Sequence, residues 1–213
     1  IFHLSKIFLF LITDIVSKNS INIYDSLEVY SNYEEELSIK SNNELVAQVD
    51  KNAIVKAVGV GTTSIEFKIK DVIKEHLDAV LTKLDEAGAD IKFDGSDVIV
   101  NKVDKLLPVN VTTLTYPGFP TDLQQPFTVL LTQSNGKSKV TETIWENRFM
   151  HIPYLNSLGA DISVKNQTAT IMGPHKLVGT EVVATDLRAG AAMVAAALLA
   201  EGKTTITNVQ YIT

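Results

Sequence analysis

Between residues 140 and 172, the pattern of apolar and polar positions changes from a strand pattern to a helical pattern and back again. A glycine after the helical run is typical of a helix C-cap, and the alternating side chains beyond it are typical of two strands joined by a turn. The predicted elements are a strand at Val140–Ile144, a loop at Glu146–Arg148, a helix ending at Leu158 with Gly159 as its C-cap, strands at Asp161–Val164 and Thr168–Met172, and a turn at Lys165–Gln167.

The order of these elements repeats along the chain. Residues 119–149 align with residues 183–213, because both contain Thr-Asp-Leu, an apolar helical run, Gly-Lys and then a β-rich segment. Strands separated by helices of this length favour parallel pairing through right-handed crossovers. We therefore expect an α/β fold, or an α+β fold with mixed sheets; two copies are too few to favour a solenoid.

A second pair of segments also aligns. Residues 69–91 match residues 140–162, with Leu84 opposite Leu155 and a glycine four residues later in each copy. Ala-Asp-Ile ends both segments. The same supersecondary unit is therefore expected to occur at least twice between residue 66 and the last residue.

Residues before about 66 do not fit this unit. They are rich in strand-forming residues, with turn signals at Asn42–Asn43 and Lys51–Asn52. Residues 27–67 resemble part of a bacterial immunoglobulin-like repeat. We therefore predict a β-rich N-terminal segment at 1–65, followed by a second domain at 66–213.

The first twenty residues contain an apolar run at Ile7–Ile12 that is too short to span a bilayer. The segment has no small-residue cleavage site of the kind that ends a signal peptide. The chain begins with Ile rather than Met, which is compatible with a fragment. We interpret the run as a buried strand or an unnatural start.

Composition narrows the classes of partner. With 213 residues, 45% hydrophobic and 21% charged, the chain has the composition of a soluble globular protein. A net charge of -6 argues against nucleic acid, which needs a basic surface. The chain has no cysteine, and its four histidines lack metal-ligand spacing. We expect no metal, no cofactor, no nucleic acid and no membrane partner.

The two Thr-Asp-Leu segments each precede a predicted helix, and the residue after the leucine is Gln124 in the first and Arg188 in the second. In the first, Thr121 and Gln124 have the spacing of a capping box, with Asp122 in the first turn. Asp122 alone is explained by the helix dipole. In the second, Thr185 is the predicted N-cap, and Arg188 stands where a capping box places Glu or Gln.

A cation at a helix start is unfavourable unless an anion lies beside it. Arg188 therefore points either to a bound anion or to a local pair with Asp186 or Glu181. Arg148, in Trp-Glu-Asn-Arg-Phe, lies either in a cleft or on a solvated surface. If the repeated units pack side by side, both arginines and Asp122 meet at an anionic substrate, with Asp122 placed to act as general base towards a hydroxyl.

Four segments carry a resemblance to a known family: Tyr-Pro-Gly-Phe-Pro-Thr-Asp-Leu at 116–123, Thr-Glu-Thr-Ile-Trp-Glu-Asn-Arg-Phe-Met-His at 141–151, Leu-Gly-Ala-Asp-Ile at 158–162 and Ala-Thr-Asp-Leu-Arg-Ala at 184–189. Residues 66–213 resemble UDP-N-acetylglucosamine 1-carboxyvinyltransferases, a family of enolpyruvyl transferases. The resemblance implies domains of repeated β-α-β-α-β-β units. It also implies transfer of enolpyruvyl from phosphoenolpyruvate to the 3-hydroxyl of UDP-N-acetylglucosamine, a cytoplasmic step of peptidoglycan synthesis.

The resemblance also assigns roles to individual residues. Asp122 corresponds to an aspartate that contacts the sugar 3-hydroxyl and is a candidate base. The backbone of Ile144 corresponds to a contact with the sugar nucleotide. Arg148 and Arg188 correspond to arginines that line the cleft near the phosphoenolpyruvate site.

The features of the family's second domain are not recognisable in this sequence. The family's second domain carries a Lys-Asn pair and a mobile loop whose cysteine donates a proton, and this chain has no cysteine. We therefore expect a partial enzyme with little or no turnover, which lacks its second domain. The alternative is a non-catalytic cell-surface or chimeric protein that carries a borrowed α/β domain.

Overall fold

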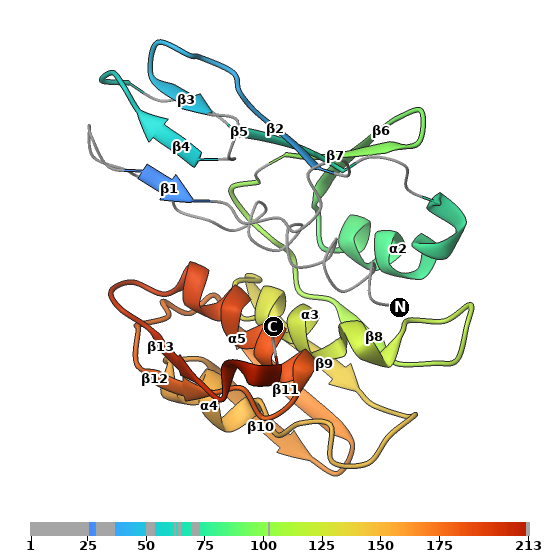
Figure 1. Ribbon diagram of the computed structural model, residues 1–213. Helices are drawn as coiled ribbons and strands as arrows, with labels where there is room; N and C mark the ends of the chain where they lie inside the picture. The colour runs from blue at the N-terminus through green and yellow to red at the C-terminus, as the bar shows by residue number, and fades with distance from the viewer. Residues whose placement is uncertain are drawn as a thin grey trace. The chain divides into compact units, whose positions relative to one another are not determined.

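The computed structural model describes residues 26–28, 37–49, 54–61, 63, 65–69, 73–101 and 103–211. These residues form two compact units, which are described separately (Figure 1). Of the described residues, unit 1 holds 75–89 and 103–211, and unit 2 holds the remainder. The expectation for the first twenty residues lies outside the described part of the chain.

The described residues of unit 2 lie mainly in strands, and the β-rich N-terminal segment at 1–65 stays a prediction. A turn at Asn43 is fixed by its own side chain, whose Oδ1 accepts a hydrogen bond of 3.1 Å from the N–H of Leu45. The turn predicted at Lys51–Asn52 lies outside the described residues. One antiparallel sheet has the order β1 (Ser26–Glu28), β4 (Ile54–Ala57), β3 (Ala47–Val49), and the other has the order β2 (Leu37–Ser41), β5 (Ile65–Ile69), β7 (Asp97–Asn101), β6 (Asp90–Asp94). A short 3₁₀ helix, η1 (Lys74–His76), follows β5 at the border between the two units.

Unit 1 combines helices with mixed sheets, which confirms the predicted fold class. Its four-stranded sheet has the order β10-β11-β9-β8, and β12 pairs with β13. The elements are α2 (Asp78–Glu86), β8 (Asn110–Thr112), η2 (Thr121–Leu123), α3 (Gln124–Leu131), β9 (Gly136–Thr141), α4 (Ile152–Ser157), β10 (Asp161–Lys165), β11 (Thr168–Gly173), β12 (Glu181–Val183), α5 (Leu187–Leu199), β13 (Thr205–Thr207) and η3 (Val209–Tyr211).

The internal repeat is visible in the strand pairing. Strands β8 and β9 are parallel with α3 between them, and β12 and β13 are parallel with α5 between them. Thr141 and Thr207, which are equivalent in the repeat, both end the second strand of their pair. The strands in and beside the second aligned pair of segments also have the same pairing in both copies, since the strands of β5-β7-β6 and of β9-β11-β10 pair antiparallel. Parallel pairing was thus correctly predicted for the crossovers but does not extend to the hairpins.

The second pair of aligned segments is equivalent in packing. Leu84 on α2 and Leu155 on α4 are both fully buried. The glycine after each helix has a left-handed backbone, with φ of +79° at Gly88 and +105° at Gly159. A residue with a Cβ is strained in that region, so both glycines end their helices for the same reason.

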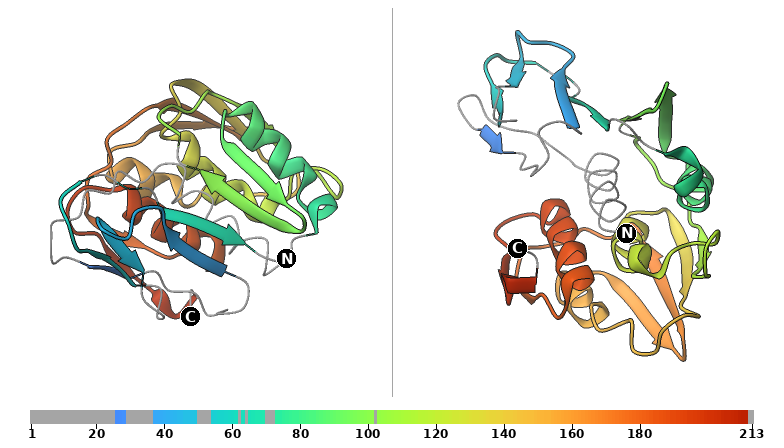
Figure 2. Two further views of the ribbon diagram at one scale, coloured as in Figure 1. Left: turned by 90° about the horizontal axis from the view of Figure 1, so that it is seen from above. Right: turned by 45° about the vertical axis from the view of Figure 1, so that its right-hand side comes forward.

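The core of unit 1 lies around α3, whose eight residues are all buried. This helix packs on β9 and β11 and against the alanine-rich face of α5 (Figures 1 and 2). The side chain of alanine ends at the Cβ, which allows two helices to approach closely. Pro126 lies in the first turn of α3, where no intrahelical bond requires its missing N–H.

Strand β9 differs from the prediction. It begins at Gly136 and ends at Thr141, whereas the pattern predicted a strand at Val140–Ile144. The chain leaves the strand because the side chain of Glu142 accepts the backbone N–H groups of Ile144 and Trp145 and curls the next residues into a loop.

The division into domains at residues 65–66 stays a prediction. Strand β5, which begins at Ile65, pairs with β2 on one side and β7 on the other. The resemblance of residues 27–67 to an immunoglobulin-like repeat likewise stays a prediction. Within the described residues, no helix is both long and apolar enough to cross a bilayer.

Candidate functional site

Asp122 lies on η2, the single 3₁₀ turn that leads into α3. The predicted capping box is absent here. Thr121 donates its hydroxyl to Glu142 Oε2 at 2.7 Å instead of capping the helix, and the amide of Gln124 is buried without a hydrogen-bond partner. Neither η2 nor α3 has a side-chain cap. The carboxylate of Asp122 is therefore not used to close its own helix.

The start of α5 is organised differently. Asp186, not Thr185, is the N-cap: its Oδ1 accepts the backbone N–H groups of Arg188 at 2.8 Å and Ala189 at 3.1 Å. The hydroxyl of Thr185 is buried without a partner. Asp186 has an extended backbone with φ of -157°, as an N-cap requires. The cap therefore lies one residue later than predicted.

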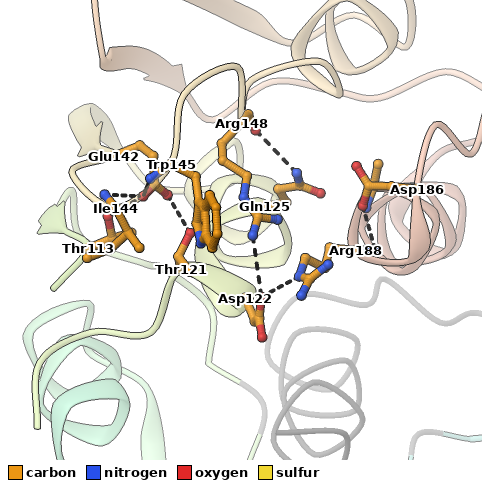
Figure 3. Close-up of polar contacts among 11 residues, drawn as sticks. Thr113, Thr121, Asp122, Gln125, Glu142, Ile144, Trp145, Arg148, Asp186 and Arg188 are labelled. Carbon is orange, nitrogen blue, oxygen red and sulfur yellow. Dashed lines mark hydrogen bonds and ion pairs between the residues drawn. The ribbon is translucent and has the colours of Figure 1, made fainter. Parts of the chain in front are cut away.

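The Asp122 carboxylate forms ion pairs with two arginines that lie on different elements (Figure 3). Arg188 Nε donates to Asp122 Oδ1, and Arg148 Nη2 lies 3.8 Å from the same oxygen. Only 17% of the Asp122 side chain and 15% of the Arg148 side chain are exposed, so solvent screens these pairs weakly. In the described part of the chain, Arg188 forms its side-chain ion pair with Asp122 rather than with Asp186 or Glu181.

These two arginines are the only arginines in the sequence, whose other basic residues are lysines and four histidines. Arginine differs from lysine in its planar fork of donors, which matches carboxylates and phosphates. Both guanidinium groups lie beside the Asp122 carboxylate, so Arg148 is not on a solvated surface, and the role of the two arginines in binding an anion stays a prediction.

Arg148, in the loop between β9 and α4, is held by a residue of its own loop and by a residue of α3. The guanidinium carbon lies 5.8 Å from the centre of the Trp145 ring, within reach of a cation–π interaction. The backbone carbonyl of Arg148 accepts a hydrogen bond of 3.2 Å from Gln125 Nε2 on α3. The loop is thus tied to the helix that follows Asp122 (Figure 3).

His151, directly before α4, is fully buried, and neither ring nitrogen has a side-chain hydrogen-bond partner. Burial lowers its pKa from 6.5 to about 3, against the opposing effects of the Asp186 carboxylate and the Arg148 backbone. His151 is therefore neutral near pH 7 and belongs to the packing beneath the site.

Two cavities flank the site. The first, of about 290 Å³, is lined by Asp122, Ile144 and residues 114–118, together with Glu75, His76 and Ala79 before and on α2. The second, of about 270 Å³, is lined by Trp145, Arg148 and the turn at Asn166–Gln167. Asp122 thus lines the first cavity, whereas Arg148 lines the second. No group of three potential metal ligands occurs among the described residues.

The comparisons with known proteins identify the family. Residues 52–213 match the family described as EPSP synthase (3-phosphoshikimate 1-carboxyvinyltransferase). The chain belongs to this family. It is 51% identical over 144 residues to the UDP-N-acetylglucosamine 1-carboxyvinyltransferase of Halothermothrix orenii, covering 68% of this chain and 34% of that protein. It is 46% identical over 155 residues to UDP-N-acetylglucosamine 1-carboxyvinyltransferase 2 of Geobacillus kaustophilus, covering 73% and 36%.

A solved structure agrees with this membership. The enolpyruvyl transferase NikO from Streptomyces tendae superposes with a TM-score of 0.61 and 31% identity, covering 64% of this chain and 32% of that one. The chain therefore spans about a third of the length of the curated relatives that it matches. The family resemblance found in the motifs is confirmed, and the roles of Asp122, Ile144, Arg148 and Arg188 stay predictions.

Sequence reasoning missed Glu142 in this member of the EPSP synthase family. It is 1% exposed and accepts hydrogen bonds from four donors around the site. The signal was present in the alternation of β9, since a period of two places residue 142 on the same face as the fully buried Val140. An acidic residue in such a position needs partners, and here they come from the loops that carry the candidate site.

Proposed function

We propose that this chain forms part of an enzyme that transfers enolpyruvyl from phosphoenolpyruvate to the 3-hydroxyl of UDP-N-acetylglucosamine. The transfer belongs to peptidoglycan synthesis, and we place it in the cytoplasm. The observation that carries the proposal is that Arg148 and Arg188 converge on Asp122, which lines an apolar cavity, in a chain of this family.

Asp122 is proposed as the general base. As the sugar 3-oxygen forms a bond to C2 of the enolpyruvyl group, its proton passes to the carboxylate, and the methylene carbon gains a proton from an acid outside this chain. The intermediate then loses a proton from its methyl carbon as the C–O bond to phosphate breaks. The enol ether and inorganic phosphate are the products.

Arg148 and Arg188 are proposed to bind the anionic groups of phosphoenolpyruvate. In the structure, Asp122 accepts a hydrogen bond from Arg188 Nε and forms a longer ion pair with Arg148. An anionic substrate that pairs with the arginines competes with Asp122 for the same donors. Binding of phosphoenolpyruvate therefore releases carboxylate oxygens towards the sugar hydroxyl, so the base becomes available when the second substrate is present.

Ile144 is proposed to contact the sugar nucleotide through its backbone carbonyl. Its N–H is already donated to Glu142 Oε1 at 2.8 Å, which leaves the oxygen as the backbone polar group for a ligand. Ile144 and Asp122 line the same 290 Å³ cavity, near the lower end of the volume range of small-molecule sites. One sugar ring is thus placed between a hydrogen-bond acceptor and the base.

Because the chain spans about a third of its relatives, it is proposed to hold only part of the site. By resemblance, the Lys-Asn pair and the cysteine proton donor come from the family's other domain. The 213-residue chain alone should therefore bind substrate but release little phosphate. A coupled phosphate-release assay that shows normal turnover would contradict this part of the proposal.

Binding tests the function directly. Isothermal titration of the chain with UDP-N-acetylglucosamine should give saturable binding, and UDP alone should bind more weakly because it lacks the sugar that faces Asp122. Phosphoenolpyruvate is then titrated into the saturated complex. Arg188→Gln should weaken this second step about tenfold, whereas Lys137→Gln, an exposed cation on β9, should leave it unchanged. Absence of any sugar-nucleotide binding would favour the non-catalytic alternative.

A further inference from the structure

Glu142 follows the last residue of β9 and is 1% exposed. Burial of a carboxylate costs free energy unless hydrogen-bond donors surround it. Both of its oxygens are satisfied. Oε1 accepts from the Thr113 hydroxyl at 2.8 Å and from the N–H groups of Ile144 at 2.8 Å and Trp145 at 3.2 Å, and Oε2 accepts from the Thr121 hydroxyl at 2.7 Å.

The four donors come from three separate segments. Thr113 lies just beyond β8, Thr121 directly precedes Asp122, and Ile144 with Trp145 opens the loop that leads to Arg148. The first and third segments are also joined directly, since Thr143 donates its N–H to the Thr113 hydroxyl at 2.9 Å. Glu142 therefore links the segment of Asp122 to the segment of Ile144, in addition to the bond between Gln125 and the Arg148 carbonyl (Figure 3).

We propose that Glu142 is a positioning residue for the transfer reaction. It fixes the distance between the Asp122 carboxylate and the Ile144 carbonyl across the 290 Å³ cavity, and so it sets the fit of the sugar. This inference rests on the proposed function, because it treats that cavity as the sugar site. Glu142 itself does not line the first cavity; it acts through Thr121 and through the loop backbone.

The contacts explain why a carboxylate occupies this position. Four donors converge, and an ionised carboxylate is an acceptor at both oxygens. Glutamine keeps one carbonyl oxygen for the Ile144 and Trp145 N–H groups but places an amide NH₂ opposite the Thr121 hydroxyl. Thr121 must then turn to accept instead of donate, and the remaining bonds lose their charge assistance.

The test compares dissociation constants for UDP-N-acetylglucosamine by titration calorimetry in the whole chain. Glu142→Gln should weaken binding about tenfold and Thr121→Val about fivefold. The double variant should resemble Glu142→Gln alone, because both changes break the same link and partners in one network are not additive. Glu181→Gln, an exposed glutamate on β12, is the matched control and should stay within about twofold of the unaltered chain.

A purely structural role gives a different result: the melting temperature falls, but the folded protein keeps its dissociation constant. That outcome in both Glu142→Gln and Thr121→Val would overturn the proposal. If Glu142→Gln fails to fold, Thr121→Val and Thr121→Ser decide it together: both alter the lining of the first cavity, but only Thr121→Val removes the hydroxyl that donates to Oε2, so only Thr121→Val should weaken binding.

Amide hydrogen exchange separates this inference from the proposed function. Glu142→Gln should speed exchange at Ile144 and Trp145 and in the segment of Asp122, while Ala189, bonded to Asp186, stays unchanged. If the unaltered chain binds no UDP-N-acetylglucosamine, the proposed function fails, and faster exchange at both segments still supports Glu142 as their anchor. Unchanged exchange overturns the anchoring role whether or not the ligand binds.

Discussion

The two Thr-Asp-Leu segments are equivalent in the repeat, yet their aspartates have opposite uses. Asp186 accepts two backbone N–H groups and closes α5. Asp122 caps nothing and instead holds the side chain of Arg188, with Arg148 beside it. The cap of α5 also fixes the residue that reaches Asp122, because Arg188 donates its own N–H to Asp186. One copy therefore holds the arginine that pairs with the aspartate of the other copy.

The largest expected difference in ligand binding is between the two variants in which one of these aspartates is changed to asparagine. Asp122→Asn should weaken UDP-N-acetylglucosamine binding about fiftyfold, because a charged acceptor for the sugar hydroxyl is lost. Asp186→Asn should leave binding nearly unchanged, since asparagine is as good an N-cap as aspartate. Titration calorimetry on both variants decides between them. Equal losses at the two positions would contradict the division of roles.

The next effect is the pH dependence of the free energy of unfolding that the buried His151 causes. The folded-state pKa of His151 is about 3, below its ordinary value of 6.5, so the unfolded chain binds more protons between these values. Its contribution to stability is present above pH 6.5 and is lost as the pH falls, at about 1.4 kcal/mol per unit below that value. From pH 7 to 5 the free energy of unfolding should fall by about 2 kcal/mol.

Urea unfolding at both pH values measures this loss. His151→Leu removes the titrating group while keeping an apolar side chain in the buried position, so the variant should lose distinctly less stability between pH 7 and pH 5. An equal loss in the variant would assign the pH dependence to other groups.

A smaller effect distinguishes the cap that the structure shows from the cap that the sequence predicted. Asp186→Ala should lower the free energy of unfolding by about 1 kcal/mol, the usual cost of a lost N-cap. Thr185→Val should change it by no more than about 0.5 kcal/mol, because that buried hydroxyl has no partner to lose. Thermal or urea unfolding measures both, and a reversed order would restore Thr185 as the cap.

The smallest effect is expected at Gln124, the other half of the predicted capping box. Its amide is buried without a partner, so Gln124→Met replaces an unsatisfied polar group by an apolar one of similar size. The free energy of unfolding should stay within about 0.5 kcal/mol of the unaltered chain or rise slightly. A loss above about 1 kcal/mol would indicate that the amide has a structural partner after all.

The sequence predicted the repeated unit well because the repeat is a local pattern. Matching leucines and glycines mark the same helix end in both copies, and Leu84 and Leu155 are buried alike. The cap at Thr121 was predicted wrongly because its hydroxyl donates to Glu142, which is distant in sequence, and the cap at Thr185 because the adjacent Asp186 takes that role. A local motif contains no information about such a competitor.

The residues of the candidate site could be named from the sequence, but the sequence did not show how they are arranged in space. Arg188 lies 66 positions from Asp122, and only the packing of α5 against α3 brings them together. The repeat made this convergence a reasonable hypothesis, but spacing alone left a local pair with Asp186 equally open. Glu142 was missed because its four partners belong to three segments that meet only in the folded chain.

Trp145 has a practical consequence for all of these measurements. It is the only tryptophan in the sequence, its side chain is 57% exposed, and its ring lies beside the Arg148 guanidinium. Any ligand that draws Arg148 away from the ring changes the surroundings of the indole. The chain thus contains a single indole at the candidate site, and its emission, excited selectively over that of the six tyrosines, should report occupancy without a label.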